Sequence, residues 1–523
     1  MLQTMKKKPE FKQMSFDTAV RNPERYIGIL KSIEEYNGVI LNDDNLLKIV
    51  SKLYLEKEVT SDRIVIDKNS NIDSISNKVK EVNITRKADG GYPKGYQSRF
   101  WTYVRTLSEL GFVYAQYKEK FIISEVATEL LNGNIDEQEA FSLQMMRANR
   151  KSPYRNVLND YNYLKFIIKI LIELKRTNKK LSYNEFILST FNKNDDVESF
   201  LNILIKEKDV FTNSVKTYEY IKKNFPKVNI EKTVMRDYPD VVLRLLRITG
   251  LVTITNHANT IYLELNSNKL DYYRDLIKYD FKLSENEKDD KVKYFNRISY
   301  LDQKLKDILI SHREKEVKII NYNDIINNII ENYNLNKENV VNSLKKIEST
   351  RSKENLAFKY IPTPLKFEFF ISIFMYFSLG KDYKIKPNYK MDSSGLPISH
   401  APGNKGDIEI FSDKICWVLE VSLIRNKTQQ YNNETTNLMR HLSNEKGYQE
   451  YFLSFIAPFI HQDTQRLFDA LIITLKIEEN MENIYGKTFN LEEFIEKMDD
   501  KNIFEEIKNY TKEYTKKLKE KLS

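Results

Sequence analysis

Hydrophobic and polar positions in the first half of the chain repeat one order of elements. A predicted helix places Phe100, Val104 and Leu107 on one face and ends at Gly111, and two short strands with a charged turn follow it. The same order of helix, glycine, strand, polar turn and strand recurs around Gly250. This order is typical of a winged helix, in which the helix before the wing enters the major groove of DNA. We therefore predict two winged-helix modules in tandem.

The second half of the chain has a different pattern. The charged run SENEKDDKVK lacks periodicity and predicts a linker. Beyond it come an apolar helix that ends at Gly380, two adjacent strands, a buried strand and further helices. We predict a multidomain α+β protein whose C-terminal α/β core has a mixed central sheet flanked by helices. The predicted parts are winged-helix subdomains at 1–140 and 141–280, a linker at 281–300 and the core domain at 301–523.

Two acidic residues occupy matching positions in the two adjacent strands, 407–411 and 415–421. A two-residue loop at Asp413 and Lys414 pairs Ser412 with Ile415, and counting back from that pair places Asp407 opposite Glu420. Cross-strand partners lie about 4.5–5.5 Å apart between Cβ atoms. Carboxylates at that distance repel each other, and a divalent cation held by oxygen ligands would offset the repulsion.

Further polar residues surround this hairpin in the sequence. Glu368 lies in the apolar helix, and a buried carboxylate there needs a partner. In the segment after the hairpin, Gln430, Glu434, Asn437 and His441 fall on one face of a predicted helix. Each of these residues, taken singly, fits an ordinary charge at the end of an element equally well. Their order, with an acidic helix on each side of an acidic hairpin, favours a nuclease core.

The same residues resemble a known family. The matching pieces are Glu368, APGNKGD ending at Asp407, EVS at 420–422, Glu434 followed by Arg440 and His441, and FIAPFIHQDT at 455–464. This set is similar to the cleavage domain of AlwI-like type IIS restriction endonucleases, PD-(D/E)XK enzymes that include strand-specific nicking endonucleases. Ser422 stands where threonine is usual, and the lysine that the superfamily places two residues after the second acid is absent. Either His441 or Lys427 is left to orient the attacking water.

The resemblance implies a site-specific type IIS DNA endonuclease, either a restriction enzyme or a strand-nicking one. It would read a short asymmetric duplex site and hydrolyse a phosphodiester bond a few base pairs outside it with Mg²⁺, or with Mn²⁺ in its place. Asp407, Glu420 and the carbonyl of Val421 would bind the ion. Glu368 would hold a water or a second ion, and Glu434 and His441 would orient these groups or contact the phosphate.

Two other functions stay open on the sequence. One is a non-enzymatic winged-helix DNA-binding protein with a degenerate nuclease fold, and the other is a repair or mobile-element nuclease. Partners implied by the resemblance are double-stranded DNA, a second nuclease copy or small subunit for double-strand cleavage, and a companion DNA methyltransferase.

The charge is distributed unevenly. The chain has 83 Lys and Arg against 74 Asp and Glu; residues 1–300 hold 50 and 41 of these, and residues 301–523 hold 33 of each. The whole surplus therefore precedes the nuclease core, where DNA reading would need it, although a lysine-rich composition would also produce it. The candidate DNA contacts are Arg86, Lys87, Lys94, Arg99, Thr102, Arg105, Thr106 and Arg236. A solvated basic loop is the alternative explanation for the basic residues before residue 95.

One cysteine, Cys416, excludes an intramolecular disulfide and a cysteine zinc cluster. The N-terminus is basic without an apolar segment after it, and no apolar run approaches membrane-spanning length. We therefore expect a cytoplasmic protein without a membrane partner.

Overall fold

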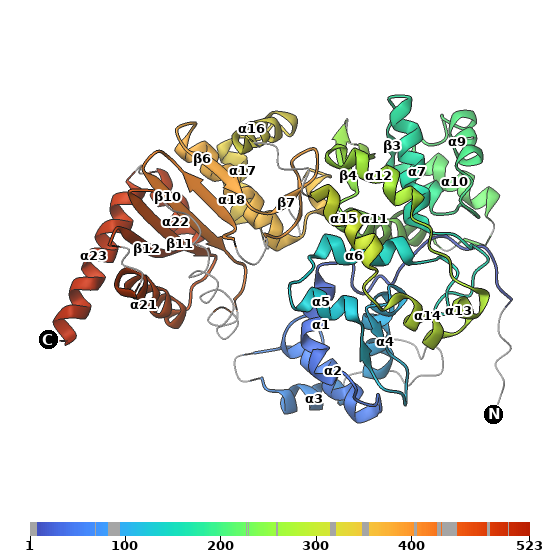
Figure 1. Cartoon of the computed structure of the whole chain (residues 1–523), viewed down its shortest axis with the longest axis horizontal. Coiled ribbons are helices and arrows are strands. Elements are labelled where there is room, and N and C mark those ends of the chain that lie inside the picture. The colour runs from blue at the N-terminus through green and yellow to red at the C-terminus, as the bar shows by residue number, and fades with distance from the viewer. Residues whose placement is uncertain are drawn as a thin grey trace. The chain divides into compact units, whose positions relative to one another are not determined.

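The chain folds into two compact units, residues 1–317 and 318–523 (Figure 1). The structure is a computed structural model. It describes residues 8–67, 70–81, 95–225, 227–228, 230–257, 260–313, 321–347, 355–401, 405–425, 430, 447–478, 482–499 and 502–522. Each unit is described here by itself.

The first helix–strand–strand pattern forms as predicted. Phe100, Val104 and Leu107 are buried, and Gly111 has a φ of +71°, which lets the chain turn out of the helix. A side chain at Gly111 would collide with Ile298, so the turn also needs a residue without Cβ. The elements are α1 (Arg25–Ile33), η1 (Glu34–Tyr36), α2 (Asp43–Leu55), α3 (Ile72–Glu81), α4 (Tyr96–Glu109), β1 (Val113–Tyr114) and β2 (Ile122–Ile123).

The second pattern also forms, around Gly250, whose φ is +70°. Strand β5 lies between β3 and β4 in a three-stranded antiparallel sheet. The elements of this part are α5 (Glu125–Leu131), α6 (Glu137–Arg147), α7 (Tyr163–Arg176), β3 (Leu181–Ser182), α8 (Tyr183–Ser189), α9 (Val197–Lys206), α10 (Ser214–Asn224), η2 (Thr233–Asp237), α11 (Tyr238–Ile248), β4 (Val252–His257), β5 (Thr260–Leu265), η3 (Ser267–Lys269) and α12 (Leu270–Lys278).

The segment predicted as a linker, 281–300, is instead a folded part of the first unit. It forms α13 (Glu285–Asp289) and α14 (Lys291–Ile298). Tyr294 and Ile298 are fully buried, and the Tyr294 hydroxyl donates to the Glu109 carbonyl at 2.7 Å. The prediction missed Tyr294 and Ile298 because the charged run directly before them lacks apolar periodicity. The two residues are four positions apart and therefore lie on one face of the helix. Helix α15 (Gln303–Arg313) packs on α6 and α12, so the first unit extends past residue 301 to 317.

The second unit is built on a mixed sheet, as predicted. Its five strands have the order β12-β11-β10-β9-β6. Strands β10, β11 and β12 are parallel, whereas β9 runs antiparallel to both β10 and β6. The elements are α16 (Tyr322–Asn332), α17 (Lys337–Lys345), η5 (Phe358–Tyr360), α18 (Thr363–Leu379), β6 (Lys384–Pro387), β7 (Lys390–Met391), β8 (Pro397–Ser399), β9 (Ile408–Phe411), β10 (Ile415–Val421), β11 (Glu450–Ala457), α21 (Gln462–Glu478), β12 (Ile484–Asn490), α22 (Leu491–Asp499) and α23 (Ile503–Leu522).

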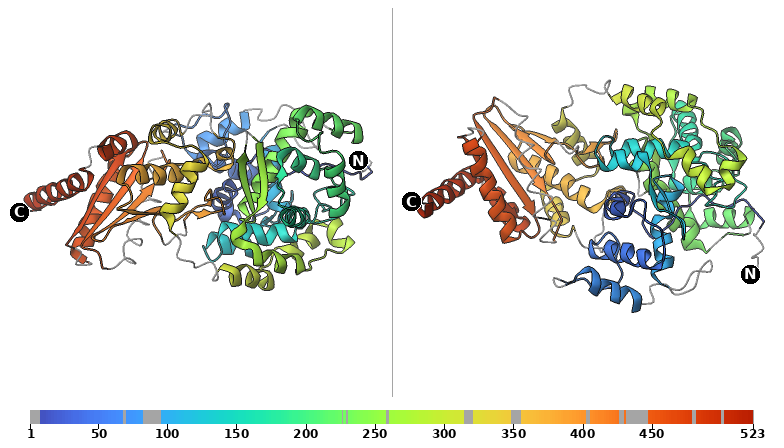
Figure 2. Two further views of the ribbon diagram at one scale, coloured as in Figure 1. Left: turned by 90° about the horizontal axis from the view of Figure 1, so that it is seen from above. Right: turned by 60° about the horizontal axis from the view of Figure 1, so that its bottom comes forward.

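Helices cover both faces of this sheet (Figure 2). Trp417 and Leu419 of β10 pack on one face with residues of α18, α22 and α23. Cys416 and Val418 point to the other face, where they pack with residues of α21. Because alternate side chains meet different helices, β10 is apolar at successive positions, and Glu420 is its one charged residue.

None of the helices that the structure describes is long and apolar enough to cross a membrane.

Gly486 lets α21 approach β12 closely. A Cβ there would lie 2.4 Å from Ile472 Cδ1 and 3.0 Å from Phe468 Cε1. We expect Gly486→Ala to lower the free energy of unfolding of the second unit by about 1–3 kcal/mol, because added volume strains a packed core. In a Trp101→Phe background, urea unfolding followed by fluorescence reports on buried Trp417 of this unit. Adding Ile472→Val should reduce the loss; an undiminished loss would contradict this packing.

Candidate active site

The hairpin of β9 and β10 has the predicted register. Leu419 lies opposite Ile408, and Cys416 lies opposite Phe411. At the turn, the Ser412 N–H donates to the Ile415 carbonyl at 2.9 Å. The same register, continued by one residue beyond the end of β9, sets Asp407 opposite Glu420. The prediction of this hairpin from the turn and the strand pattern is therefore confirmed.

Asp407 is fixed from two sides just before β9 begins. Its Oδ2 accepts a hydrogen bond from the Val421 N–H at 2.9 Å, which ties the carboxylate to the end of β10. Its main-chain carbonyl accepts from the Asn388 N–H at 2.9 Å, which ties the backbone to the segment after β6. Main-chain groups thus help to hold Asp407 at the open end of the hairpin.

Gly406 allows this close approach of the two strands. A Cβ at this position would lie 2.4 Å from Val418 Cγ1 and 3.2 Å from Glu420 Oε1. Any other residue would push the chain before Asp407 away from β10. Glu420 itself is only 5% exposed. A carboxylate so deeply placed is costly unless charged or hydrogen-bonding groups compensate it, and this is the environment in which oxygen ligands bind a cation.

Glu368 has the partner that its burial required. Its Oε1 lies 2.5 Å from Nδ1 of His400, and its side chain is 4% exposed. The other oxygen, Oε2, is buried and has no hydrogen-bond partner among the described residues. Burial raises the pKa of nearby Tyr389, and the Glu368 carboxylate adds to that rise. Sequence reasoning did not identify His400 as this partner, because no local pattern links residues that far apart.

The described residues bring together a pair of acids rather than the predicted set of five. Asp407 and Glu420 are the next residues beyond the last pair of the ladder, Ile408 and Leu419, but within the described ranges no three His, Cys, Asp or Glu residues form a group that could hold a metal ion. Glu368 is therefore not placed in one cluster with the pair. Glu434 and His441, with Lys427, lie outside the described residues.

Gln430, predicted on the same polar face as Glu434, is fully buried. Its amide donates to the carbonyls of Ile424 and Phe459, at 3.1 and 2.9 Å, and its oxygen accepts from the His461 N–H at 3.0 Å. It thus connects the segment after β10 with the segment after β11. Nε2 of His461 lies 3.0 Å from the Arg425 carbonyl, a contact of the same bridging kind.

The profile of the AlwI restriction endonuclease family matches residues 108–363 and 291–497, and these matches together span most of the chain. The chain belongs to the AlwI restriction endonuclease family. Membership in this family supports activity as a DNA endonuclease, a hydrolase of the nuclease class. No curated protein matches the chain.

Three solved structures resemble this AlwI-family chain. The small subunit of the heterodimeric restriction endonuclease R.BspD6I is 20% identical, with a TM-score of 0.26, over 35% of this chain and 98% of that one. The BpuJ1 endonuclease binding domain, solved with pyrene- and phenanthrene-modified DNA, is 12% identical, with a TM-score of 0.30, over 55% and 97%. Restriction endonuclease FokI is 12% identical, with a TM-score of 0.24, over 93% and 96%. The family membership rests on the profile match alone.

The candidate DNA contacts of this AlwI-family protein divide by exposure. Arg105 and Arg236 are exposed, and Arg99 and Thr102 are half-buried. Thr106 is 0% exposed, so its prediction as an outward-facing DNA contact is wrong. Helix α4 packs against other helices over more of its circumference than one apolar stripe predicts, and position 106 falls inside the packed part. Arg86, Lys87 and Lys94 lie outside the described residues.

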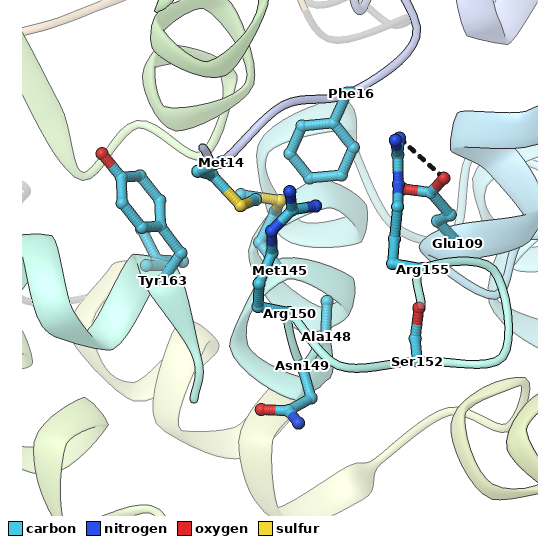
Figure 3. A pocket seen from close by; sticks show the side chains of 11 residues that line it. Met14, Phe16, Glu109, Met145, Ala148, Asn149, Arg150, Ser152, Arg155 and Tyr163 are labelled. Atoms are coloured by element: carbon cyan, nitrogen blue, oxygen red, sulfur yellow. Dashed lines mark ion pairs between the residues drawn. The ribbon is translucent and has the colours of Figure 1, made fainter. Parts of the chain in front are cut away.

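We assign no catalytic role to a buried cluster of charged residues that lines a small cavity in the first unit (Figure 3). Nη2 of Arg155 lies 2.8 Å from Oε1 of Glu109, beside a small cavity. Arg150, also at this cavity, donates to the Gln13 carbonyl at 2.5 Å. Burial, followed by the nearby charge of Arg155, lowers the pKa of Arg150 to about 10. The cluster joins the N-terminal segment to α4 and to the loop after α6, a structural role that the sequence pattern did not reveal.

Proposed function

We propose that this protein is a type IIS site-specific DNA endonuclease. The first unit would read a short asymmetric duplex site, and the second would hydrolyse a phosphodiester bond a few base pairs outside it. The observation that carries the proposal is the Asp407–Glu420 pair, held in register at the open end of a rigid hairpin. In a restriction endonuclease family, such a pair is best explained as the hydrolytic centre. A companion DNA methyltransferase would protect the host's own copies of the site.

The donor set fits a hard divalent cation, and we propose Mg²⁺, which Mn²⁺ could replace. Asp407 and Glu420 offer carboxylate oxygens, and the Val421 carbonyl would add a neutral one. Glu368, with one buried oxygen lacking a hydrogen-bond partner in the described part of the chain, would accept a hydrogen bond from a nearby water or hold a second ion. When bound, Mg²⁺ supplies positive charge to the phosphate and makes water more acidic.

The chemical step needs an oriented water and a protonated leaving group. The water oxygen attacks phosphorus, the bond from phosphorus to the leaving oxygen breaks, and one proton passes from the water to a base while another reaches the leaving oxygen. We propose that the acids of the hairpin fix the direction of attack, because their backbone is held by β6 and β10. Glu434 and His441 remain the candidates for orienting the water or contacting the phosphate, with Lys427 as the alternative to His441.

DNA reading is proposed for the two helix–strand–strand modules of the first unit. In each, the helix before the hairpin, α4 or α11, would lie in the major groove in the manner of a winged helix. Arg99, Thr102 and Arg105 lie on α4, and Arg236 lies on η2, directly before α11. The basic surplus of residues 1–300 supports this assignment, because phosphate contacts dominate affinity for DNA.

We predict that Asp407→Asn and Glu420→Gln each abolish cleavage but leave DNA binding within about threefold. Both changes keep side-chain size and remove a charged ligand, so the rate should fall at least about 10²-fold. Single-turnover cleavage of plasmid in Mg²⁺, with gel-shift affinity measured in parallel, gives both quantities. Asp413→Asn, in the turn of the same hairpin, is the matched control and should cleave normally. Full cleavage by either site variant would remove the assignment.

We predict that Arg105→Gln and Arg236→Gln weaken DNA binding and reduce its salt dependence. Each lost phosphate contact should lower the slope of log K against log[salt] by about 1. Fluorescence anisotropy over a range of KCl concentrations measures this slope. Arg176→Gln serves as the control, since Arg176 is exposed on α7 and paired with Glu173. An unchanged slope in both variants would place the DNA-reading surface elsewhere in the chain.

We predict that one protein molecule nicks one strand at a fixed distance from its site. The described part of the chain has one hairpin with this acid pair, and one such centre hydrolyses one bond per event. Double-strand cleavage would require a second nuclease copy or a small subunit. On supercoiled plasmid, nicked product should precede linear product, and linear product should grow with protein concentration. Linear product without a nicked precursor, at one protein per DNA, would contradict a single centre.

A further inference from the structure

The carboxylate pair creates an electrostatic problem for its substrate. A scissile phosphate is an anion, and it must approach Asp407 and Glu420 closely. A bound divalent cation offsets part of the repulsion, and a side-chain cation placed beside the pair would offset more of it as charge builds up on the phosphoryl oxygens. We therefore searched the described residues around the hairpin for such a cation.

Two other basic side chains near the hairpin, among the residues that the structure describes, are already engaged. Lys386 lies opposite Glu409 on the neighbouring strand, is ion-paired with it, and sits 5.7 Å from the ring centroid of Phe411. The imidazole of His400 contacts Glu368. These contacts hold both groups on carboxylates other than Asp407 and Glu420.

Position 422, two residues after Glu420, carries no cation. Ser422 is 7% exposed, and its Oγ accepts a hydrogen bond from the Ile424 N–H at 3.1 Å. Its own N–H donates to the Ile456 carbonyl at 3.0 Å, so the residue remains part of the ladder with β11. A neutral, buried hydroxyl in this place cannot supply the positive charge.

Lys405 lies in the segment that leads into the hairpin, three residues before β9 begins. It comes two residues before Asp407 and directly before Gly406. Its side chain is exposed, and it makes no ion pair or hydrogen bond with any residue that the structure describes. A lysine with its long stem and an unengaged ammonium group can turn toward an arriving phosphate.

Gly406 brings the backbone of Lys405 close to the pair. Because a Cβ on Gly406 would lie 3.2 Å from Glu420 Oε1, the Cα of Lys405 is one peptide unit, about 3.8 Å, from a residue that abuts this carboxylate. The Gly406 carbonyl accepts from Nδ2 of Asn388 at 2.7 Å, which fixes the peptide unit between Gly406 and Asp407. The four-carbon stem of Lys405 therefore starts from a defined point within reach of the carboxylates.

We propose that Lys405 is a further catalytic residue, whose ammonium group contacts the scissile phosphate and stabilises the charge that develops on its oxygens. The role rests on the proposed endonuclease function and requires no proton transfer by the lysine. It moves the cationic position from β10 to the segment that precedes β9, two residues before Asp407.

The test compares Lys405→Gln, Lys405→Arg and Lys414→Gln in the full chain. Lys414 lies in the turn at the other end of the hairpin, so its variant makes the same charge change away from the acid pair. Single-turnover cleavage in Mg²⁺ should fall about 10²–10³-fold in Lys405→Gln, should be largely restored by Lys405→Arg, and should stay within about twofold in Lys414→Gln. Affinity for site DNA with Ca²⁺ in place of Mg²⁺ should change less than about threefold in all three.

Two results would overturn the assignment of Lys405. One is cleavage by Lys405→Gln at the rate of Lys414→Gln, and the other is a loss of affinity as large as the loss of rate, which would make Lys405 a binding contact only. Asp407→Asn, assayed alongside, separates this inference from the proposed function. If Asp407→Asn is inactive while Lys405→Gln is active, only the role of Lys405 fails; if Asp407→Asn cleaves normally, the endonuclease centre itself is misplaced.

Discussion

The two-residue turn between β9 and β10 is the constraint on which the second unit depends. Because the turn is short, the Ser412–Ile415 contact fixes the register of the whole hairpin, and a slip of one residue would move every side chain to the other face. Trp417 and Leu419 would then leave the core that they share with α18, α22 and α23. The packing of both sheet faces therefore enforces the same register that sets Asp407 opposite Glu420.

This coupling explains how two carboxylates can be kept close together. Repulsion between them is opposed by the burial of apolar side chains along the entire hairpin and by main-chain bonds to Asp407. Packing of the surrounding core offsets the free-energy cost of holding the two carboxylates close together. Substrate or a cation can then bind to a site that is already formed. Preorganisation of this kind is what makes a charged centre effective, since little rearrangement is needed when the reaction begins.

The sequence predicted the parts of the fold that depend on local pattern. The hairpin register, the helix ending at Gly380 and the two helix–strand–strand modules follow from turn chemistry, glycine caps and periodicity. The linker prediction failed because tertiary packing of Tyr294 and Ile298 outweighs the charged run beside them. The prediction that Thr106 faces outward was wrong for a similar reason, because a helix that packs on several sides also buries residues outside its main apolar stripe. The contacts of Glu368 with His400 and of Arg155 with Glu109 join distant segments, and no local pattern encodes them.

The proposed function requires Asp407 and Glu420 to act as one cation-binding centre, and Mn²⁺ binding tests this directly. Electron paramagnetic resonance of free Mn²⁺, titrated into the full chain with its DNA, counts bound ions per protein without relying on cleavage. We expect the tightest site to be lost equally in Asp407→Asn and Glu420→Gln and to be retained in Asp413→Asn. Unchanged Mn²⁺ stoichiometry and affinity in both site variants would contradict it.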